Sequence, residues 1–182
     1  MKLIILDRDG VINQDSPDYI KHPDEWLPIE GSLAAIAKLH QAGWKVVVAS
    51  NQSGLARGFF DAATLHAMHQ KCLQLLAPMG GTIDAFFVCP HGPDDNCHCR
   101  KPAIGLFEDI SKRFDSSLAN VPAVGDSLRD LQAASSMGCQ PWLVLTGNGF
   151  KTESNPDLPA GTRVAQNLAQ VVEQLLAQTE GA

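Results

Sequence analysis

Short apolar runs alternate regularly with longer stretches of helical periodicity along this chain, and this alternation limits its possible folds more than any other pattern in the sequence. The apolar runs lack polar alternation, which is typical of strands buried on both faces of a parallel sheet. We expect strands at Leu3–Leu6, Lys45–Ala49, Ala85–Val88, Val121–Val124 and Trp142–Leu145. We expect helices at Ser32–Gln41, Ala62–Ala77, Ile104–Arg113, Leu128–Met137 and Leu168–Gln178. The pattern predicts an α/β fold with a parallel sheet between two layers of helices.

The length and composition of the chain fit one domain. Its 182 residues, 45% of them hydrophobic, can bury one core without disulfides. The sequence has no internal repeat or interdomain linker, so we expect a single domain over residues 1–182 that acts as a monomer. The turn-rich stretch Asn148–Gly161 is predicted to be a surface loop.

The charge balance argues against several classes of partner. A total of 14 Lys and Arg against 20 Asp and Glu gives a formal net charge of −6, which produces no field that attracts nucleic acid or anionic membranes. The apolar start Met1–Leu6 is too short for a signal peptide, and no stretch is long enough to span a membrane. Clustered cysteines indicate metal binding in a reducing compartment. We therefore expect a cytoplasmic protein that binds neither nucleic acid nor membrane.

Polar side chains follow four of the predicted strands. In open parallel sheets, ligands bind beyond the carboxyl ends of the strands, so these residues are expected to converge. The four segments are Asp7-Arg8-Asp9-Gly10, Ser50-Asn51-Gln52-Ser53, Cys89-Pro90-His91 and Gly125-Asp126-Ser127.

Three of these residues are carboxylates, namely Asp7, Asp9 and Asp126. Clustered carboxylates make a hard oxygen site that suits Mg²⁺, and the ion would reduce the repulsion between Asp7 and an incoming phosphate. Asp7 is the predicted nucleophile for phosphoryl transfer. Asp9, one side chain further out, is the predicted general acid and base.

The charge of a transferring phosphoryl group needs donors and a cation around it. Ser50 offers a hydroxyl and Lys101 an ammonium. Because Lys101-Pro102 leads into a predicted helix, we expect the ammonium close to the amino end of that helix, where anions are favoured.

These residues, in this order, resemble the four motifs of the haloacid dehalogenase (HAD) superfamily of phosphatases. The motifs correspond here to Asp7-Arg8-Asp9-Gly10, Ser50-Asn51, Lys101 and Gly125-Asp126-Ser127-Leu128-Arg129-Asp130. The resemblance implies a Rossmann-like fold, with Asp7 as nucleophile, Asp9 as acid and base, and Ser50 and Lys101 as phosphoryl stabilisers. It also implies Mg²⁺ bound by Asp7, Asp126 and the backbone carbonyl of Asp9, with Asp130 supporting the site from behind.

Residues 89–99 form a loop dense in soft metal ligands. Cys89, His91, Cys97 and Cys99 provide the tetrahedral set of a closed, structural zinc site. His98 is an alternative to His91. Such a zinc would hold a loop rich in Gly, Pro and Asp in place and so orient Arg100 and Lys101. Cys72 and Cys139 lie on apolar faces and are expected to be inert core residues.

Loops are expected to define the substrate, because residues 7–44 between the first two strands leave no room for a separate lid domain. Arg57 and Arg100 are candidates for holding a second phosphate in a bidentate way. Further candidate substrate contacts are Asn51, Gln52 and Ser53 before Arg57, and Asp15, Ser16, Pro17 and Asp18 after the catalytic loop.

Two groups within the superfamily share these features. The segment Asn51-Gln52-Ser53-Gly54-Leu55-Ala56-Arg57-Gly58, with Cys-Pro-His and Cys-Arg-Lys-Pro, resembles the heptose bisphosphate phosphatases of lipopolysaccharide-core biosynthesis. The zinc loop and Asp-Arg-Asp-Gly are shared with the histidinol-phosphate phosphatases, and the short loop is closer to those. The resemblance implies a small phosphorylated sugar, or a similar metabolite, as substrate. A non-enzymatic zinc-loop binding module is a third hypothesis, but it predicts a missing catalytic group and none is missing.

Overall fold

The computed structural model describes residues 1–180, with side chains through Gln178, so the last two residues of the predicted domain lie outside the described part. Its centre is a parallel sheet of six strands in the order β3-β2-β1-β4-β5-β6. The strands are β1 (Leu3–Leu6), β2 (Lys45–Asn51), β3 (Ala85–Cys89), β4 (Pro122–Gly125), β5 (Gln140–Val144) and β6 (Arg163–Ala165). This is the strand order of a Rossmann fold, and the predicted fold class is confirmed.

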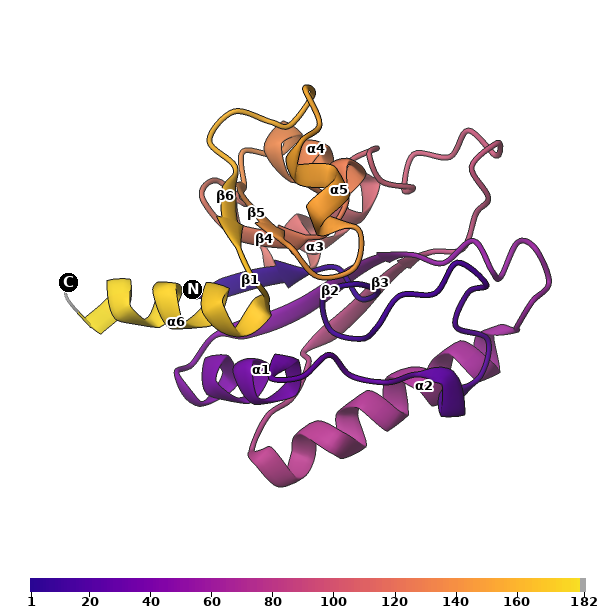
Figure 1. Ribbon diagram of the computed structural model, residues 1–182, viewed down its shortest axis with the longest axis horizontal. Helices are drawn as coiled ribbons and strands as arrows, with labels where there is room; N and C mark the ends of the chain where they lie inside the picture. The colour runs from indigo at the N-terminus through magenta and orange to yellow at the C-terminus, as the bar shows by residue number, and fades with distance from the viewer. Residues whose placement is uncertain (181–182) are drawn as a thin grey trace.

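Helices cover both faces of the sheet (Figure 1). One face packs against α1 (Ser32–Gln41), α2 (Ala62–Leu76) and α6 (Leu168–Glu180), and the other against α3 (Gly105–Phe114) and α4 (Leu128–Ser136). The remaining helices are α5 (Gly149–Glu153) and two 3-10 turns, η1 (Pro23–Glu25) and η2 (Ala77–Met79).

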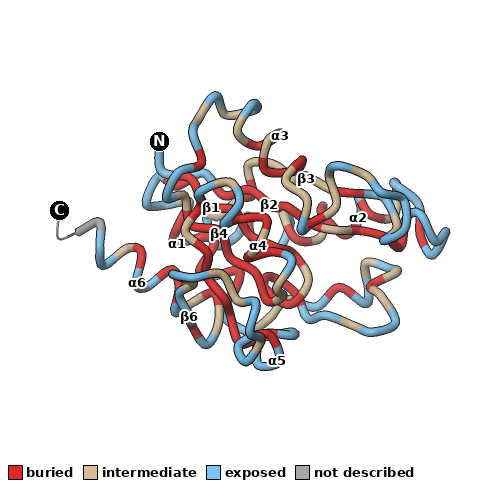
Figure 2. The backbone as a smooth tube through the Cα atoms, turned by 90° about the horizontal axis from the view of Figure 1, so that it is seen from above, coloured by how far each residue is buried: buried red, intermediate tan, exposed pale blue. Residues whose placement is uncertain are grey.

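The strands are apolar throughout because each one contributes to two cores. In β1, Ile4 and Leu6 belong to the core under α1, α2 and α6, whereas Leu3 and Ile5 belong to the core under α3 and α4. Alternate side chains of a strand point to opposite faces, so a sheet covered on both sides needs apolar residues at every position. Figure 2 shows the central strands buried along their length.

The structure corrects the sequence analysis in the region after β5. Residues 149–153, predicted as part of a surface loop, form α5, in which Gly149 and Thr152 are buried. The strand β6 was not predicted; it pairs with β5, where Val164 lies beside Leu143. Both elements are too short for a periodic pattern to develop, so only tertiary contacts specify them. Two predicted strands also run further than expected, because Ser50, Asn51 and Cys89 still pair in the sheet.

The connection between β1 and β2 contains only η1 and α1, which confirms that a separate lid domain is missing between these strands. The strand order reverses direction between β1 and β4, and this is the position where open α/β sheets bind ligands. Asp7 follows β1 and Asp126 follows β4. Among the described residues, no helix has the length and apolarity needed to cross a membrane.

Candidate active site

Asp7 lies at the carboxyl end of β1, where its main-chain N–H donates to the carbonyl of Val124 on β4. Its carboxylate is 7% exposed and belongs to a buried cluster in which Asp7, Asp126 and Asp130 each place an oxygen within 4.8 Å of the others. Burial raises the pKa of Asp7 to about 7, and the neighbouring carboxylates add to this effect while Lys101 opposes it. The site therefore concentrates negative charge that the protein only partly neutralises.

Asp126 is 1% exposed and follows β4. Burial, and then the charge of Asp130, raise the pKa of Asp126 to about 6. A cation between two buried carboxylates with raised pKa values would stabilise their ionised forms, and a ligand set made only of oxygen suits a hard divalent cation. The observed residues therefore fit the predicted magnesium site.

Asp130 contacts two neighbours of this site, Lys101 and Ser127. One oxygen, Oδ1, lies 2.7 Å from Lys101 Nζ, and the other, Oδ2, accepts hydrogen bonds from the main chain and hydroxyl of Ser127 at the start of α4. Because both oxygens already have partners, Asp130 is poorly placed to bind the cation directly.

Lys101 is 3% exposed, and its ammonium contacts three oxygen atoms. These are Oδ1 of Asp7 at 2.9 Å, the carbonyl of Ala49 at 2.6 Å and Oδ1 of Asp130 at 2.7 Å. Although burial opposes it, the two carboxylates raise the pKa of Lys101 above its ordinary value. Its position is therefore explained by these oxygens rather than by the amino end of α3, which begins only at Gly105.

The main chain of Lys101 is fixed by the side chain of Asn51. The Asn51 amide donates to the carbonyl of Lys101 and its oxygen accepts from the Lys101 N–H, each at 3.0 Å. Asn51 was predicted as a substrate contact. In the structure it lines the cavity above Asp7 and also anchors Lys101, the predicted phosphoryl-stabilising lysine.

The carboxylate of Asp9 is held by three side chains. Arg8 donates to it at 2.9 Å, and the amides of Asn13 and Gln52 each donate at 2.8 Å. Burial opposes ionisation of Asp9, but Arg8 and the two amides more than compensate, so the pKa of Asp9 lies below its ordinary value. Arg8, only 2% exposed, was not predicted as a site residue.

Ser50 is buried and does not line the cavity that contains most of the other predicted site residues. Its hydroxyl accepts a hydrogen bond of 2.8 Å from the amide of Gln52. Since the same amide also donates to Asp9, Gln52 connects the predicted general acid with the predicted phosphoryl-binding serine.

A cavity of about 170 Å³ opens above these residues. Its lining includes the predicted residues Asp7, Asp9, Asp15, Ser16, Asn51, Gln52, Ser53, Arg100 and Lys101. It also includes Arg8, Tyr19, Ile20 and Arg129, which sequence reasoning missed. The place of Arg129 in the cavity wall could have been predicted, because this residue lies in the first turn of the helix that follows Asp126. The place of Tyr19 could not, because it depends on a left-handed backbone conformation with a φ of 65°.

Three predicted substrate contacts lie outside this cavity. Pro17 and Asp18 line two neighbouring hollows. Arg57 is exposed, and its guanidinium carbon lies 5.8 Å from the centroid of the Tyr19 ring. The structure therefore brings Arg100, but not Arg57, into the cavity wall.

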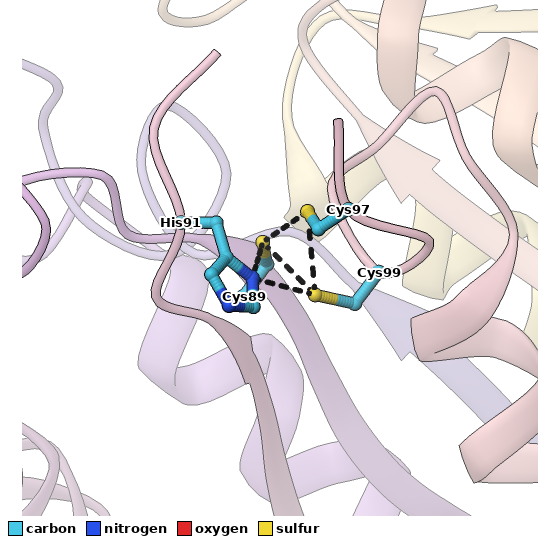
Figure 3. Close-up of side chains that lie close together, drawn as sticks. All are labelled: Cys89, His91, Cys97 and Cys99. Carbon is cyan, nitrogen blue, oxygen red and sulfur yellow. Dashed lines mark hydrogen bonds between the residues drawn. The ribbon is translucent and has the colours of Figure 1, made fainter. Parts of the chain in front are cut away.

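The side chains of the four predicted zinc ligands lie close together (Figure 3), with their ligand atoms within 4.8 Å of one another. The three sulfur atoms of Cys89, Cys97 and Cys99 are 3.2–3.7 Å apart, and Nδ1 of His91 lies 3.3 Å from Cys99 Sγ. A tetrahedral zinc with Zn–S bonds of about 2.3 Å needs sulfur atoms about 3.8 Å apart, so the cluster could hold zinc with little adjustment. The alternative ligand His98 pairs with Glu108 at 2.7 Å instead. Cys72 and Cys139 are buried in the core, as predicted.

Comparison with known proteins agrees with this geometry. Residues 98–171 match the HAD-hydrolase-like family model, and residues 2–133 match the polynucleotide kinase 3 phosphatase model. The D-glycero-β-D-manno-heptose-1,7-bisphosphate 7-phosphatase of Bordetella bronchiseptica is 65% identical over 97% of this chain and 98% of its own length. The chain belongs to this family of HAD phosphatases.

Other relatives of this HAD phosphatase support the assignment. The protein of the same name from Pseudomonas aeruginosa is 53% identical over 96% of this chain and 97% of its own length. The crystal structure of the B. bronchiseptica D,D-heptose 1,7-bisphosphate phosphatase, complexed with magnesium and phosphate, superposes with a TM-score of 0.97 at 65% identity, covering 98% of this chain and 99% of that one. The corresponding structure from Burkholderia thailandensis has a TM-score of 0.77 at 47% identity, covering 97% and 99%. The hypothesis of a non-enzymatic binding module is therefore wrong for this HAD phosphatase.

Proposed function

We propose that this phosphatase hydrolyses the 7-phosphate of D-glycero-β-D-manno-heptose 1,7-bisphosphate, a step in lipopolysaccharide-core biosynthesis. The observation that carries the proposal is the 65% identity, over nearly the whole of both chains, to the B. bronchiseptica enzyme with that name. The cavity supports it, because it combines the nucleophilic carboxylate with the basic residues Arg100 and Arg129. A substrate with two phosphates needs such additional positive charge.

The carboxylates of Asp7 and Asp126, with the main-chain carbonyl of Asp9, would hold the catalytic magnesium. When bound, the cation neutralises the charge between Asp7 and the phosphate dianion and so allows them to approach. The buried, poorly neutralised Asp7 and Asp126 support this assignment, as does the magnesium in the structure of the B. bronchiseptica relative.

In the first half of the reaction, a carboxylate oxygen of Asp7 attacks phosphorus, and the bond between phosphorus and the sugar oxygen breaks. Asp9 gives its proton to the departing sugar oxygen. Without substrate, the neighbours of Asp9 hold its pKa below the ordinary value, so Asp9 must take up a proton from solvent before this step. The arriving phosphate dianion favours that uptake, because a nearby negative charge raises the pKa of a carboxylate.

In the second half, Asp9 accepts a proton from water, and the water oxygen attacks the phosphorus of the aspartyl phosphate. The bond from phosphorus to Asp7 breaks, releasing inorganic phosphate and free Asp7. Throughout, the ammonium of Lys101, which already contacts Asp7, neutralises charge on the transferring group. The hydroxyl of Ser50 accepts from Gln52, which leaves its own proton free. Because Ser50 does not line the cavity, donation of this proton to a phosphoryl oxygen would require its side chain to move toward the substrate.

Zinc bound by Cys89, His91, Cys97 and Cys99 would have a structural role. All four tetrahedral positions are provided by the protein, which leaves none for substrate. The loop between these ligands and α3 carries Arg100 and Lys101, so the zinc would fix the position of both basic residues relative to Asp7.

The proposal is tested by steady-state rates on one preparation with four substrates: the β and α anomers of the heptose bisphosphate, heptose 7-phosphate and histidinol phosphate. We expect the highest kcat/KM for the β bisphosphate. A higher kcat/KM for histidinol phosphate would transfer the assignment to histidine biosynthesis. Preference for the α anomer would keep the reaction but change the substrate.

A further inference from the structure

The segment after β5 surrounds Asp126, although it belongs to none of the four motifs. A Cβ atom on Gly147 would lie 2.2 Å from Asp126 Oδ2, so only glycine allows this approach. The hydroxyl of Thr152 donates to the Asp126 carbonyl at 2.8 Å. On the other side, Thr146 donates to the carbonyl of Gly10 at 2.6 Å. The segment is therefore attached to both loops that carry the acidic cluster.

Asn148 makes the most direct contacts in this segment. Its main-chain N–H donates to Oδ2 of Asp126 at 2.7 Å, and its side-chain amide donates to the same oxygen at 3.1 Å. The amide also donates to Oδ2 of Asp15 at 3.1 Å. Asp126 is almost completely buried, so these bonds determine the rotation of its carboxylate. Both bonds go to Oδ2, which leaves Oδ1 clear of Asn148.

We propose that Asn148 is a positioning residue for the catalytic metal. It fixes the carboxylate of Asp126 for magnesium binding and connects it to Asp15, a residue of the cavity wall. The proposal rests on the magnesium site described under the proposed function. An amide suits this position because its two N–H groups can serve two carboxylates without adding charge. Partners of this kind behind a metal ligand typically affect metal affinity about 10–100-fold.

A purely structural role for Asn148 makes a different prediction. Its carbonyl accepts from the main chain of Thr152, so Asn148 also begins α5. If that were its whole role, replacing its side chain would leave the affinity of the folded protein for magnesium unchanged.

The test measures the Kd of Mg²⁺ by isothermal titration calorimetry on full-length protein that retains zinc but has been freed of magnesium. Asn148→Ala removes the side-chain donor but keeps the main-chain bond, so we expect its Kd to rise about tenfold. Gly147→Ala, which pushes a methyl group against Asp126, should raise the Kd further. The matched control is Lys151→Ala on the exposed side of α5, which should match wild type in both Mg²⁺ affinity and rate.

Asp15→Asn separates the two contacts of Asn148. It weakens the contact of Asn148 to residue 15 and keeps both bonds of Asn148 to Asp126, so we expect a raised KM for substrate with a Kd for Mg²⁺ within about twofold of wild type. If Asn148→Ala folds poorly, Asn148→Ser and the magnesium-induced shift in melting temperature give the same comparison. Wild-type protein that binds no Mg²⁺ would refute the proposed function itself. Wild type that binds Mg²⁺ with the same Kd as Asn148→Ala would overturn only the role of Asn148.

Discussion

The ammonium of Lys101 lies 2.9 Å from Oδ1 of Asp7, and side-chain exposures of 2% and 7% make this a buried ion pair. The two residues are 94 positions apart in the sequence. The pair places a fixed positive charge beside the proposed nucleophile, at the position where a transferring phosphoryl group would develop its charge. Unlike an arginine at the cavity wall, this lysine would contact the group that is common to every substrate.

Replacing Lys101 by methionine should therefore reduce activity on all substrates alike. Loss of one fixed charge donor from a transition state typically costs about 10²–10³-fold in kcat, and we expect a loss of that size for mono- and bisphosphates. The control is Lys112→Met, an exposed lysine on α3, which should keep wild-type rates. A loss confined to bisphosphates would contradict the role given to Lys101.

Asp7→Asn should abolish turnover without weakening the fold. The amide has nearly the shape of the carboxylate but is not a nucleophile, so we expect less than about a hundredth of wild-type activity. Burial already raises the pKa of Asp7 to about 7, which means that its charge is held at a cost and its removal should not lower the melting temperature. Asp109→Asn, on the exposed side of α3, controls for the substitution. Activity well above this limit would exclude an aspartyl phosphate on Asp7.

Stabilisation by magnesium should increase with pH. When folding raises the pKa of a carboxyl, the folded protein loses stability as pH rises from the unfolded pKa to the folded pKa. For Asp7 this range runs from about 3.8 to about 7, and for Asp126 from about 3.8 to about 6. Magnesium binds only the ionised forms and offsets this loss. We therefore expect the magnesium-induced rise in melting temperature to be larger at pH 8 than at pH 5.

This experiment must compare protein with and without magnesium at each pH. His69 changes the stability of the protein over the same pH range but in the opposite direction. Burial lowers its pKa to about 4, so the folded protein loses stability as pH falls from about 6.5 toward 4. The difference between the two samples cancels this contribution. In Asp126→Asn the pH-dependent part of the shift should largely disappear, whereas an unchanged shift would place the cation elsewhere.

Zinc should co-purify with the protein at about one ion per chain and survive dialysis against mild chelators, because four protein ligands enclose it. Elemental analysis of freshly purified, reduced protein measures the content. Cys99→Ser should lose zinc and also lower the rate through displaced Arg100 and Lys101. His98→Ala should keep it, since His98 pairs with Glu108. Reduced wild-type protein without zinc would refute the assignment of the four ligands.

The two candidate arginines should differ in their effect on substrate choice. Arg100 lines the cavity, and a charge-assisted hydrogen bond to a second phosphate is worth about 1.5–3 kcal/mol. Arg100→Ala should therefore lower kcat/KM for the bisphosphate about ten- to a hundredfold while hardly affecting heptose 7-phosphate. Equal losses on both substrates would mean that Arg100 does not bind a second phosphate.

Arg57→Ala should affect both substrates equally and less strongly. Its guanidinium lies over Tyr19, a residue of the cavity wall, and an exposed contact of this kind contributes about 0.5–1 kcal/mol. We expect a loss of about two- to fivefold in kcat/KM on either substrate. A loss selective for the bisphosphate would instead place Arg57 on the second phosphate.

Much of the site was predictable because its residues follow strands. A buried parallel strand needs a continuous apolar run, and the residue where that run stops must lie at the sheet edge. Asp7 and Asp126 could therefore be placed together before their distance was known. The Cys and His cluster was predictable for a related reason, since Cys89, His91, Cys97 and Cys99 are so close in sequence that a short loop can bring them together.

The fold class, the strand ends that carry the acidic cluster, and the Cys and His cluster of residues 89–99 followed from the sequence alone, because they depend on local pattern and short spacing. The side chains that support them became apparent only in the folded chain. Asn51 was found to anchor Lys101, Gln52 to hold Asp9, and Asn148 to hold Asp126. A hydrogen bond between distant segments depends on backbone positions that are set by the packing of the whole core, and no local pattern of residues records those positions.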